Sequence, residues 1–389
     1  MSSRPPTPPN KDPWEDDDFV SIPTAPLVNG VRRWGQFSTV WLAVDIQMNR
    51  YVSLKITLAT RQNDTTKEVS LYRSHIQDES PFLVVLHDTI KINGPNGEHD
   101  GFVFETMGPN LTTLLKIRPE FQIGEPWERR FTKSFAKNAL RDTIQALHFL
   151  HEHGVIHGDL HPGNILTCVE QLKVTPEAEM NLKQSESDAQ PLKPFLAEDP
   201  IMGSKAIIPV ALRAPQTILD ERLGKGIDIW AFGCLIFEMI TGRPLFVAIQ
   251  SLEGQDYDET SNDEHLIQLW EVIGPLPKPL LEKWRRADQY FDASGNRLEV
   301  KPQEDNYLSG DEDMGSGDGT DEESDGPPLA YLGRFLSLED QFMSERPGDI
   351  DEVEAKQILE LLRWIFQYDP VDRPSTSDLM NHPWLRATI

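Results

Sequence analysis

Cysteine is scarce in this chain of 389 residues, and long apolar runs are missing. The two cysteines, Cys168 and Cys234, are too few and too far apart in the sequence for a disulfide framework or a zinc site. Such usage is typical of a reducing compartment. No apolar run reaches the roughly 18 residues that a membrane-spanning helix needs, and the polar N-terminus lacks the apolar centre of a signal peptide. We therefore expect a protein of the cytoplasm and nucleus that does not enter a membrane.

Basic residues are also in short supply. The chain has 37 Lys and Arg against 63 Asp and Glu, which gives a formal net charge of −26. Phosphate contacts need clustered cations, so this balance argues against direct nucleic-acid binding and favours a basic protein partner. Residues 304–325 carry ten acidic residues and no basic one, and residues 304–327 are predicted to be a disordered tether.

The first part of the chain is predicted to form a small sheet. Residues 1–26 are rich in proline and acidic side chains, so we expect a disordered arm, with order beginning at residue 27. β-branched and aromatic residues over residues 39–57 indicate one hairpin. The segments LVVLHDTIKI and GFVFETM flank the turn-rich GPNGEHDG in a second hairpin. A helix is expected between the hairpins, over residues 65–75.

Beyond residue 107 the pattern becomes helical. Apolar residues recur at spacings of four and three over residues 133–153, and Gly154 follows as an end signal. Residues 228–241 are apolar nearly all round, as in the central helix of a large domain. Later helices are expected over residues 352–367 and 376–382. The stretches at about 170–200 and 252–328 do not fit a compact helical unit, and we interpret both as insertions, disordered over most of their length.

The chemistry begins at residues 155–166, where the sequence reads VIHGDLHPGNIL. Asp159 and Asn164 lie five apart on a short loop between the long helix and a β-branched strand. This segment resembles the catalytic loop H-R-D-x-x-x-x-N of phosphotransferases, in which the Asp accepts the proton of the substrate hydroxyl and the Asn holds Mg²⁺. The alternative is an ordinary loop with a capping Asp, so other motifs must decide.

A second motif precedes it in the sequence WGQFSTVWLAVD, which is followed by VSLKI. The first segment resembles a loop that covers nucleotide phosphates, and Lys55 on the next strand is then the lysine that pairs with them. Gly35 matches the second glycine of G-x-G-x-x-G, whereas Arg33 and Ser38 replace the first and third. Glu68, on the expected helix, is the candidate ion-pair partner of Lys55.

Three further motifs come from the helical part. Asp228 in GIDIWAFG resembles the Asp of the D-x-W-x-x-G helix of protein kinases, which holds the catalytic-loop backbone. The sequence RAPQ stands where A-P-E is expected, and DPVDRPS matches the last helical region, whose Arg373 pairs with that Glu in the pattern. Gln216 replaces the Glu here. An amide still accepts a hydrogen bond from a guanidinium, but the charge-assisted pair is lost.

Taken in order, these motifs resemble a protein kinase from about residue 31 to 387. FSTVWLA, GPNL after the hinge, and the two insertions are most similar to the SR-protein kinases and their fungal relatives. The resemblance implies an α+β bilobal fold, with a β-rich N-lobe over residues 27–107 and a helical C-lobe over residues 108–389. It also implies ATP and Mg²⁺ as cosubstrates, serine and threonine of basic, Arg/Ser-rich proteins as acceptors, and a monomer.

The resemblance assigns a role to each candidate residue. Asp159, Lys55 and Glu68 are the catalytic set, and Asn164 and Asp199 are the metal ligands. The nucleotide would be bound by Gly35, Gln36, Phe37, Ser38, Val40, Ser53, Lys55, Glu105, Met107 and Leu166. In this set Glu105 and Met107 belong to the hinge that meets adenine, and Val40 and Leu166 close the pocket from two sides.

Two departures keep other functions open. No D-F-G tripeptide occurs where its metal-binding Asp belongs, and the nearest candidate is Asp199 in AEDPIMGSKA. His161 stands where kinases acting on Ser/Thr carry a Lys that contacts the transferring phosphate. A pseudokinase scaffold without phosphotransfer is therefore the first alternative. A small-molecule phosphotransferase is the second, since those enzymes share HGDLHPGN, but they lack the ALRAP, DIWAFG and DPxDRP segments.

Overall fold

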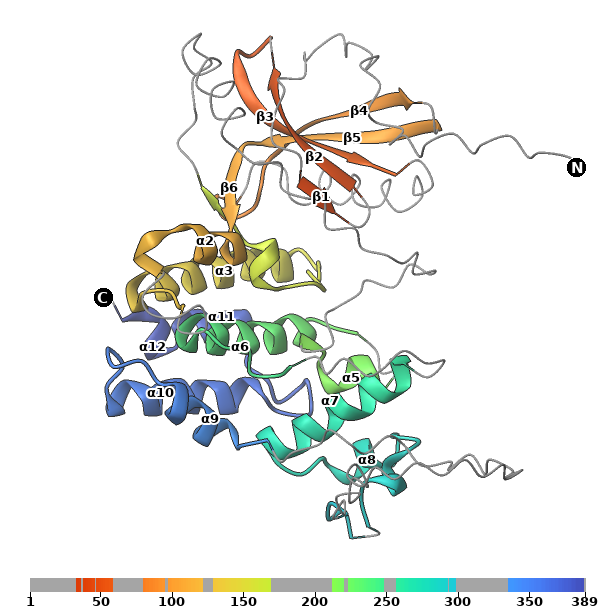
Figure 1. Ribbon diagram of the computed structural model, residues 1–389, viewed down its shortest axis with the longest axis vertical. Coiled ribbons are helices and arrows are strands. Elements are labelled where there is room, and N and C mark those ends of the chain that lie inside the picture. Colours follow the sequence, from red (N-terminus) through yellow and green to blue (C-terminus); the bar gives the residue numbers. More distant parts are fainter. Residues whose placement is uncertain are drawn as a thin grey trace, which may run out of the picture. The chain divides into compact units, whose positions relative to one another are not determined.

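The computed structural model describes residues 33–35, 38–45, 47–58, 80–94, 97–121, 129–168, 212–219, 223–247, 257–292, 294–298 and 335–387. These residues fall into two compact units. The sheet unit holds the described residues up to Leu111 together with residues 166–168, and the helical unit holds the rest. Each is described by itself below, with the elements labelled as in Figure 1.

The sheet unit is built on five antiparallel strands in the order β1-β2-β3-β5-β4 (Figure 1). The strands are β1 (Arg33–Gly35), β2 (Ser38–Asp45), β3 (Arg50–Thr57), β4 (Leu86–Gly94) and β5 (Gly97–Glu105). Both predicted hairpins are confirmed. The β2–β3 turn is closed by Asp45, whose Oδ1 accepts from the Met48 N–H at 3.1 Å, and by Asn49, whose φ of 50° lies in the left-handed region.

Strand alternation gives the sheet two different faces. Val52, Leu54 and Ile56 of β3 pack with Ala43 of β2 in one buried apolar layer. Lys55 lies between them in sequence and so projects from the opposite face. It is directly opposite Val40 on β2 and Phe102 on β5. A short second sheet pairs β6 (Met107–Asn110) with β7 (Leu166–Cys168).

The helical unit follows the predicted order of helices. Its elements are α2 (Leu111–Ile117, whose first residue belongs to the sheet unit), α3 (Lys133–Glu152), α5 (Pro215–Ile218), α6 (Gly226–Thr241), α7 (Tyr257–Ile273), α8 (Lys278–Leu281), α9 (Leu338–Glu345), α10 (Glu352–Ile365), α11 (Thr376–Asn381) and α12 (Pro383–Arg386). The four helices expected at residues 133–153, 228–241, 352–367 and 376–382 are confirmed to within two residues at each end. Among the described residues, no helix is long and apolar enough to cross a bilayer.

Helix α6 is the centre of the helical unit and contacts both α3 and α10 (Figure 1). Nearly all its residues are buried, as its apolar composition predicts. A side chain at Gly233 would lie 2.5 Å from Cγ2 of Ile365, so glycine is needed where α6 and α10 approach each other. The helix ends at Gly242, whose φ of 77° gives a left-handed cap, the conformation in which glycine commonly ends a helix.

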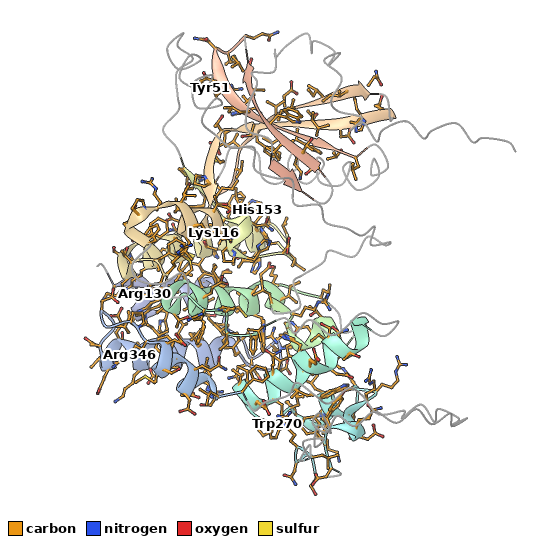
Figure 2. All side chains as sticks on the ribbon, in the orientation of Figure 1. Tyr51, Lys116, Arg130, His153, Trp270 and Arg346 are labelled. Atoms are coloured by element: carbon orange, nitrogen blue, oxygen red, sulfur yellow. The ribbon has the colours of Figure 1, made fainter. Side chains whose placement is uncertain are left out.

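Residues 257–292 and 294–298 lie inside the segment interpreted as an insertion, yet they are folded. Helix α7 buries Leu266, Ile267 and Leu269, and its Trp270, labelled in Figure 2, packs against Phe291 with ring centroids 5.5 Å apart. Acidic and polar residues interrupt the apolar spacing of this helix, which hides it in a composition-based analysis. The rest of that segment up to residue 334 lies outside the described residues.

Glu271 of α7 contacts the chain at two points that are distant in sequence. Its side chain forms a buried ion pair with Arg297, and its Oε2 accepts from the Phe335 backbone N–H at 2.7 Å. Residues 299–334 connect these two points. The last described residues before this gap and the first described residue after it therefore lie beside the same side chain, that of Glu271.

Candidate active site

The loop between α3 and β7 is held by Asp228, near the start of α6. The buried carboxylate of Asp228, 1% exposed, accepts hydrogen bonds from the backbone N–H groups of His157 at 2.9 Å and Gly158 at 2.8 Å. It also contacts Nε2 of buried His151 on α3 at 2.8 Å. Asp228 thus holds the catalytic-loop backbone, as the sequence predicts.

His151 is a residue whose role the sequence analysis missed. It lies seven residues after Ile144 on the buried face of α3, so the helical spacing that predicted the apolar face also predicts a buried imidazole. A buried His needs a polar partner, and Asp228 supplies it.

Gly158 occupies the place of the Arg in H-R-D. Its φ of 76° is in the left-handed region, which glycine adopts without strain. This conformation lies at the step where two successive N–H groups meet Asp228. The next residue is Asp159, so this left-handed step of the backbone immediately precedes the predicted catalytic carboxylate.

Asp159 and Asn164, which the sequence analysis placed on one loop, are joined by hydrogen bonds. The Asn164 Nδ2 amide donates to the backbone oxygen of Asp159 at 2.9 Å and to its carboxylate Oδ2 at 2.8 Å. The other oxygen, Oδ1, is covered from solvent and accepts no hydrogen bond from the described residues. Asp159 therefore has one oxygen fixed by Asn164 and one acceptor to which no described residue donates, and a hydroxyl group is a donor that would satisfy it.

Two histidines surround this carboxylate. Nδ1 of His157 contacts the Asp159 N–H at 3.2 Å, and Nε2 of His161 lies 3.7 Å from Asp159 Oδ2. The facing His161 imidazole, with a smaller contribution from the Asn164 amide, holds the pKa of Asp159 below its usual range, against the effect of burial. Burial lowers the pKa of His157. Asp159 is thus ionised at neutral pH.

The loop also offers an oxygen ligand for a hard cation. Because Nδ2 of Asn164 is directed at Asp159, the amide oxygen remains for a metal ion, and oxygen is the ligand that Mg²⁺ prefers. The residue present therefore fits the predicted ion. The described part of the chain contains no cluster of three or more His, Cys, Asp or Glu that would hold a metal without further ligands.

The predicted nucleotide-binding residues of β2 and β3 share one face of the sheet. Val40 and Lys55 are direct cross-strand partners, and Ser53 is opposite Phe104. Cross-strand partners project from the same side of a sheet, so these side chains form one surface. Nζ of Lys55 lies 5.6 Å from the centroid of the Phe102 ring. Gly35 and Ser38 are also paired, at the end of the β1–β2 hairpin.

The predicted hinge residues lie at the junction of the two sheets. Glu105 ends β5, where its backbone N–H donates to the Val85 oxygen at 3.0 Å and its Oε1 accepts from the Val85 N–H at 2.9 Å. Met107 begins β6 and is opposite Cys168, and Leu166 is opposite Asn110. The Glu105 side chain is therefore occupied in fixing the end of β5 to residue 85.

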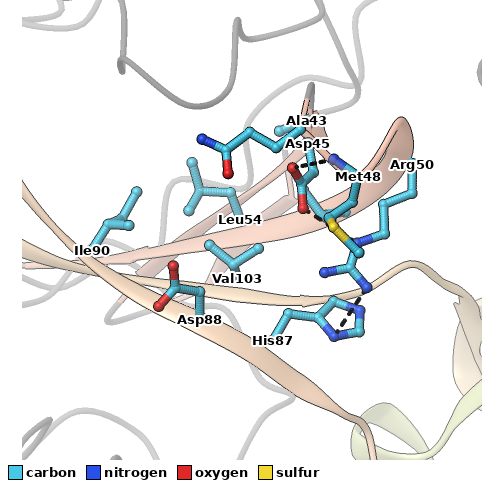
Figure 3. A pocket seen from close by; sticks show the side chains of 11 residues that line it. Ala43, Asp45, Met48, Arg50, Leu54, His87, Asp88, Ile90 and Val103 are labelled. Atoms are coloured by element: carbon cyan, nitrogen blue, oxygen red, sulfur yellow. Dashed lines mark hydrogen bonds and ion pairs between the residues drawn. The ribbon is translucent and has the colours of Figure 1, made fainter.

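The opposite face of the main sheet carries a cavity of about 240 Å³ (Figure 3). Its apolar lining includes Leu54 and Val103, and at its edge Arg50 pairs with Asp45 at 3.3 Å. Since Leu54 adjoins Lys55 in an alternating strand, this cavity is not the predicted nucleotide pocket. Four predicted site residues, Gln36, Phe37, Glu68 and Asp199, lie outside the described residues.

The departure at Gln216 is accommodated as the sequence predicts. Its Oε1 accepts from Nη2 of Arg373 at 3.0 Å, and both side chains are buried. The guanidinium also donates to the backbone oxygens of Gln367, Gly226 and Tyr368, and it lies 4.9 Å from the Trp230 ring centroid. Burial lowers the pKa of Arg373 to about 10.

Comparison with known proteins agrees with this geometry. A family model described as the protein kinase domain matches residues 34–385. The chain belongs to the protein kinase family. The matched residues include the RAPQ, DIWAFG and DPVDRP segments.

The kinase is similar to several curated proteins over most of their length. It is 25% identical to the serine/threonine-protein kinase SRPK of Physarum polycephalum, over 90% of this chain and 84% of that protein. It is 25% identical to a serine/threonine protein kinase of Aspergillus fumigatus, over 91% and 82%. It is 22% identical to the protein kinase dsk1 of Schizosaccharomyces pombe, over 91% and 79%.

A solved kinase domain gives the same fold. It covers 93% of this chain and 95% of its own, with a TM-score of 0.60 at 19% sequence identity. The predicted α+β kinase fold and the resemblance to SR-protein kinases are therefore confirmed.

Proposed function

We propose that this kinase transfers the γ-phosphate of ATP to serine or threonine hydroxyls of basic, Arg/Ser-rich proteins. The observation that carries the proposal is the state of Asp159. One carboxylate oxygen is fixed by Asn164, and the other is a covered acceptor without a hydrogen bond from the described residues. A substrate hydroxyl supplies the donor that this oxygen lacks.

In this mechanism each part of the site has a separate task. Asp159, ionised at neutral pH, accepts a hydrogen bond from the hydroxyl and aims its oxygen at the γ-phosphate. Lys55 pairs with the nucleotide phosphates, supported by Glu68, while the segment from Gly35 to Val40 covers them. The hinge at Glu105 and Met107 binds adenine. Catalysis is then positioning plus electrostatic stabilisation.

Asn164 and Asp199 would hold Mg²⁺ together with the phosphate oxygens. When bound, the ion neutralises negative charge that the protein side chains do not offset. The Asn164 amide oxygen supports this assignment, because its nitrogen is committed to Asp159. Asp199 is proposed from its position in the sequence alone.

The proposed acceptor follows from charge and from the relatives. A net charge of −26 complements a substrate rich in arginine. Proteins named SRPK and dsk1 are among those that match the chain over most of their length. We further propose that the kinase acts as a monomer in the cytoplasm and nucleus.

The test is transfer of labelled γ-phosphate to an Arg-Ser repeat protein by the purified chain, beside the Asp159→Asn variant. Wild type should phosphorylate serine, and the rate of phosphate transfer by the variant should be lower by a factor of about 100 or more. Asp288→Asn is the matched control, because Asp288 is exposed and distant in sequence from the loop; its rate should equal that of wild type.

The outcomes separate the enzyme from the scaffold. Loss of signal in Asp159→Asn alone supports phosphotransfer and makes Asp199→Asn the next variant, with lost Mg²⁺ dependence as its expected effect. Equal background in all three folded proteins, on several basic substrates, contradicts the proposal. The pseudokinase scaffold, motivated by the missing D-F-G, would then replace it.

A further inference from the structure

His161 caps the short turn that carries Asn164. The turn spans Pro162–Asn164, and His161 precedes it in an extended conformation, with φ −157° and ψ 164°. Nδ1 of the ring accepts from the Gly163 backbone N–H at 3.0 Å. The imidazole thus takes the part that Ser, Thr or Asp plays at the start of a helix.

This contact determines where the ring proton lies. A ring nitrogen that accepts a hydrogen bond carries no proton, so the neutral imidazole has its hydrogen on Nε2. Nε2 is the atom that faces Asp159 Oδ2, at 3.7 Å. That separation is longer than a direct hydrogen bond, so the interaction is between the Nε2–H dipole and the carboxylate charge. Asn164 binds the same oxygen at 2.8 Å.

Gly163 gives the ring its space. A Cβ at this position would lie 2.6 Å from Cε1 and 2.8 Å from Nδ1 of His161. Both distances are shorter than van der Waals contact allows, so any side chain at residue 163 would displace the imidazole. Gly163 is not among the described glycines with positive φ, so the backbone conformation does not require glycine there. The ring position and the absence of a side chain at residue 163 are therefore coupled.

We infer that His161 is a positioning residue that holds Asp159 as a neutral Nε2–H donor, with Gly163 fixing its ring through the backbone N–H and through the space it leaves. His161 and Asn164 both act on Oδ2 and keep Oδ1 turned to the acceptor hydroxyl. This inference rests on the proposed function. It differs from the role expected of a Lys at this place, which would offer a positive charge to the phosphate. The other titratable groups near the ring are His157, whose pKa is lowered by burial, and Glu238, whose pKa is raised by burial.

Two amide substitutions separate the functions of the two ring nitrogens. In His161→Gln the amide nitrogen replaces Nε2 as a donor to Asp159, and in His161→Asn the amide oxygen replaces Nδ1 as the acceptor for Gly163. We expect His161→Gln to keep most of the kcat and His161→Asn to lose about tenfold, with KM for ATP and for the peptide unchanged in both. Equal kcat values for the two variants would overturn the inference. His153→Asn, outside the loop, is the matched control.

A double-mutant cycle tests the coupling to Gly163. Gly163→Ala should lower kcat about as much as His161→Ala does, because the added methyl group displaces the ring. In a His161→Ala background the same change should cost almost nothing, since no ring is left to displace. An equal cost in both backgrounds would show that Gly163 acts independently of His161 and would contradict the proposed pair.

A readout without activity keeps this inference distinct from the proposed function. In ¹⁵N-histidine-labelled kinase at neutral pH, the His161 signals, identified by their loss in His161→Asn, should show Nδ1 unprotonated and Nε2 protonated. A proton on Nδ1 would overturn the inference in an active or inactive protein. If this tautomer is found in a protein that transfers no phosphate, the proposed function fails while the ring arrangement stands.

Discussion

Asp228 and Arg373 each hold a segment of the helical unit against α6, and both are buried, at 1% and 6% exposure. Asp228 fixes the catalytic loop through two backbone N–H groups and an imidazole. Arg373 fixes the segment at Gln216 and the start of α6 through oxygens that, among the described residues, are all neutral. The negative charge of Asp228 is therefore stabilised by N–H donors. The positive charge of Arg373 is stabilised by amide and carbonyl oxygens and by the Trp230 ring.

The difference shows how a buried charge tolerates the loss of its partner. A buried guanidinium with no carboxylate among its hydrogen-bond partners remains possible here because several neutral acceptors surround it and the charge of Asp369 acts on it, although burial still lowers its pKa. The carboxylate of Asp228 fixes the backbone immediately before Asp159, so its negative charge helps to position the proposed catalytic residue. We expect the two anchors to respond in opposite directions to a change of charge.

The largest effect is expected at Asp228. In Asp228→Asn an amide NH₂ group replaces one carboxylate oxygen. It would face N–H donors that then lack an acceptor, so the free energy of unfolding should fall by about 3 kcal/mol. Urea unfolding measures it, with Asp288→Asn as the control that should match wild type. An unchanged unfolding midpoint would mean that the catalytic loop is held by other contacts.

The second effect is a pH dependence from His265, which holds the same segment as Arg373. Its Nε2 contacts the Arg213 oxygen at 2.8 Å, and burial lowers its pKa from 6.5 to about 4. His265 therefore becomes protonated below pH 6.5 in the unfolded chain, but only below about pH 4 in the folded chain. Stability should fall by about 2 kcal/mol between pH 7 and pH 5 on this account.

Comparison with His265→Gln isolates this contribution, because Gln keeps a donor for the Arg213 oxygen but does not titrate. The variant should lose less stability than wild type over the same pH range, in thermal unfolding at matched ionic strength. Parallel curves for the two proteins would contradict the assignment to His265.

The third effect is a gain. Gln216→Glu restores a carboxylate opposite a guanidinium that is already buried, so the charge-assisted hydrogen bond should raise the free energy of unfolding by about 1 kcal/mol. Gln216→Leu is the matched opposite and should lower it. If Gln216→Glu lowers the unfolding temperature, the desolvation of the new carboxylate outweighs its pairing with Arg373.

The smallest effect is expected at a third anchor, Glu271, which holds Arg297 and Phe335 together. Replacing residues 301–333 by a short Gly-Ser linker leaves both contacts in place. We expect the free energy of unfolding to change by less than about 1 kcal/mol, since shortening a loop has a weak effect on closure entropy. A large loss in urea unfolding would show that the replaced segment stabilises the fold.

Much of the fold and part of the site could be predicted from the sequence. Asp159, Asn164 and Asp228 were found because their spacing in the motifs fixes their places on a loop and a helix. The end of α3 followed from Gly154, whose left-handed conformation glycine adopts more readily than other residues.

Other features depend on contacts that no spacing encodes. The direction of the His161 ring follows from a single N–H group and from the space beside Gly163. Helix α7 was hidden because its buried face includes polar residues such as His265 and Gln268, each bonded to a backbone oxygen. A polar side chain can be buried when a distant part of the chain supplies its hydrogen-bond partner. A pattern of apolar residues does not predict such a position.

The two contacts of Glu271 also indicate what would happen if the backbone were cut between residues 298 and 335. Residues 298 and 335 are distant along the chain, yet both ends of the intervening segment are fixed within reach of one side chain. A single cut of the peptide backbone between them would remove no hydrogen bond or ion pair of the described residues. The resulting fragments, one ending after α7 and the other beginning before α9, should therefore stay associated as a nicked protein and separate only when it unfolds.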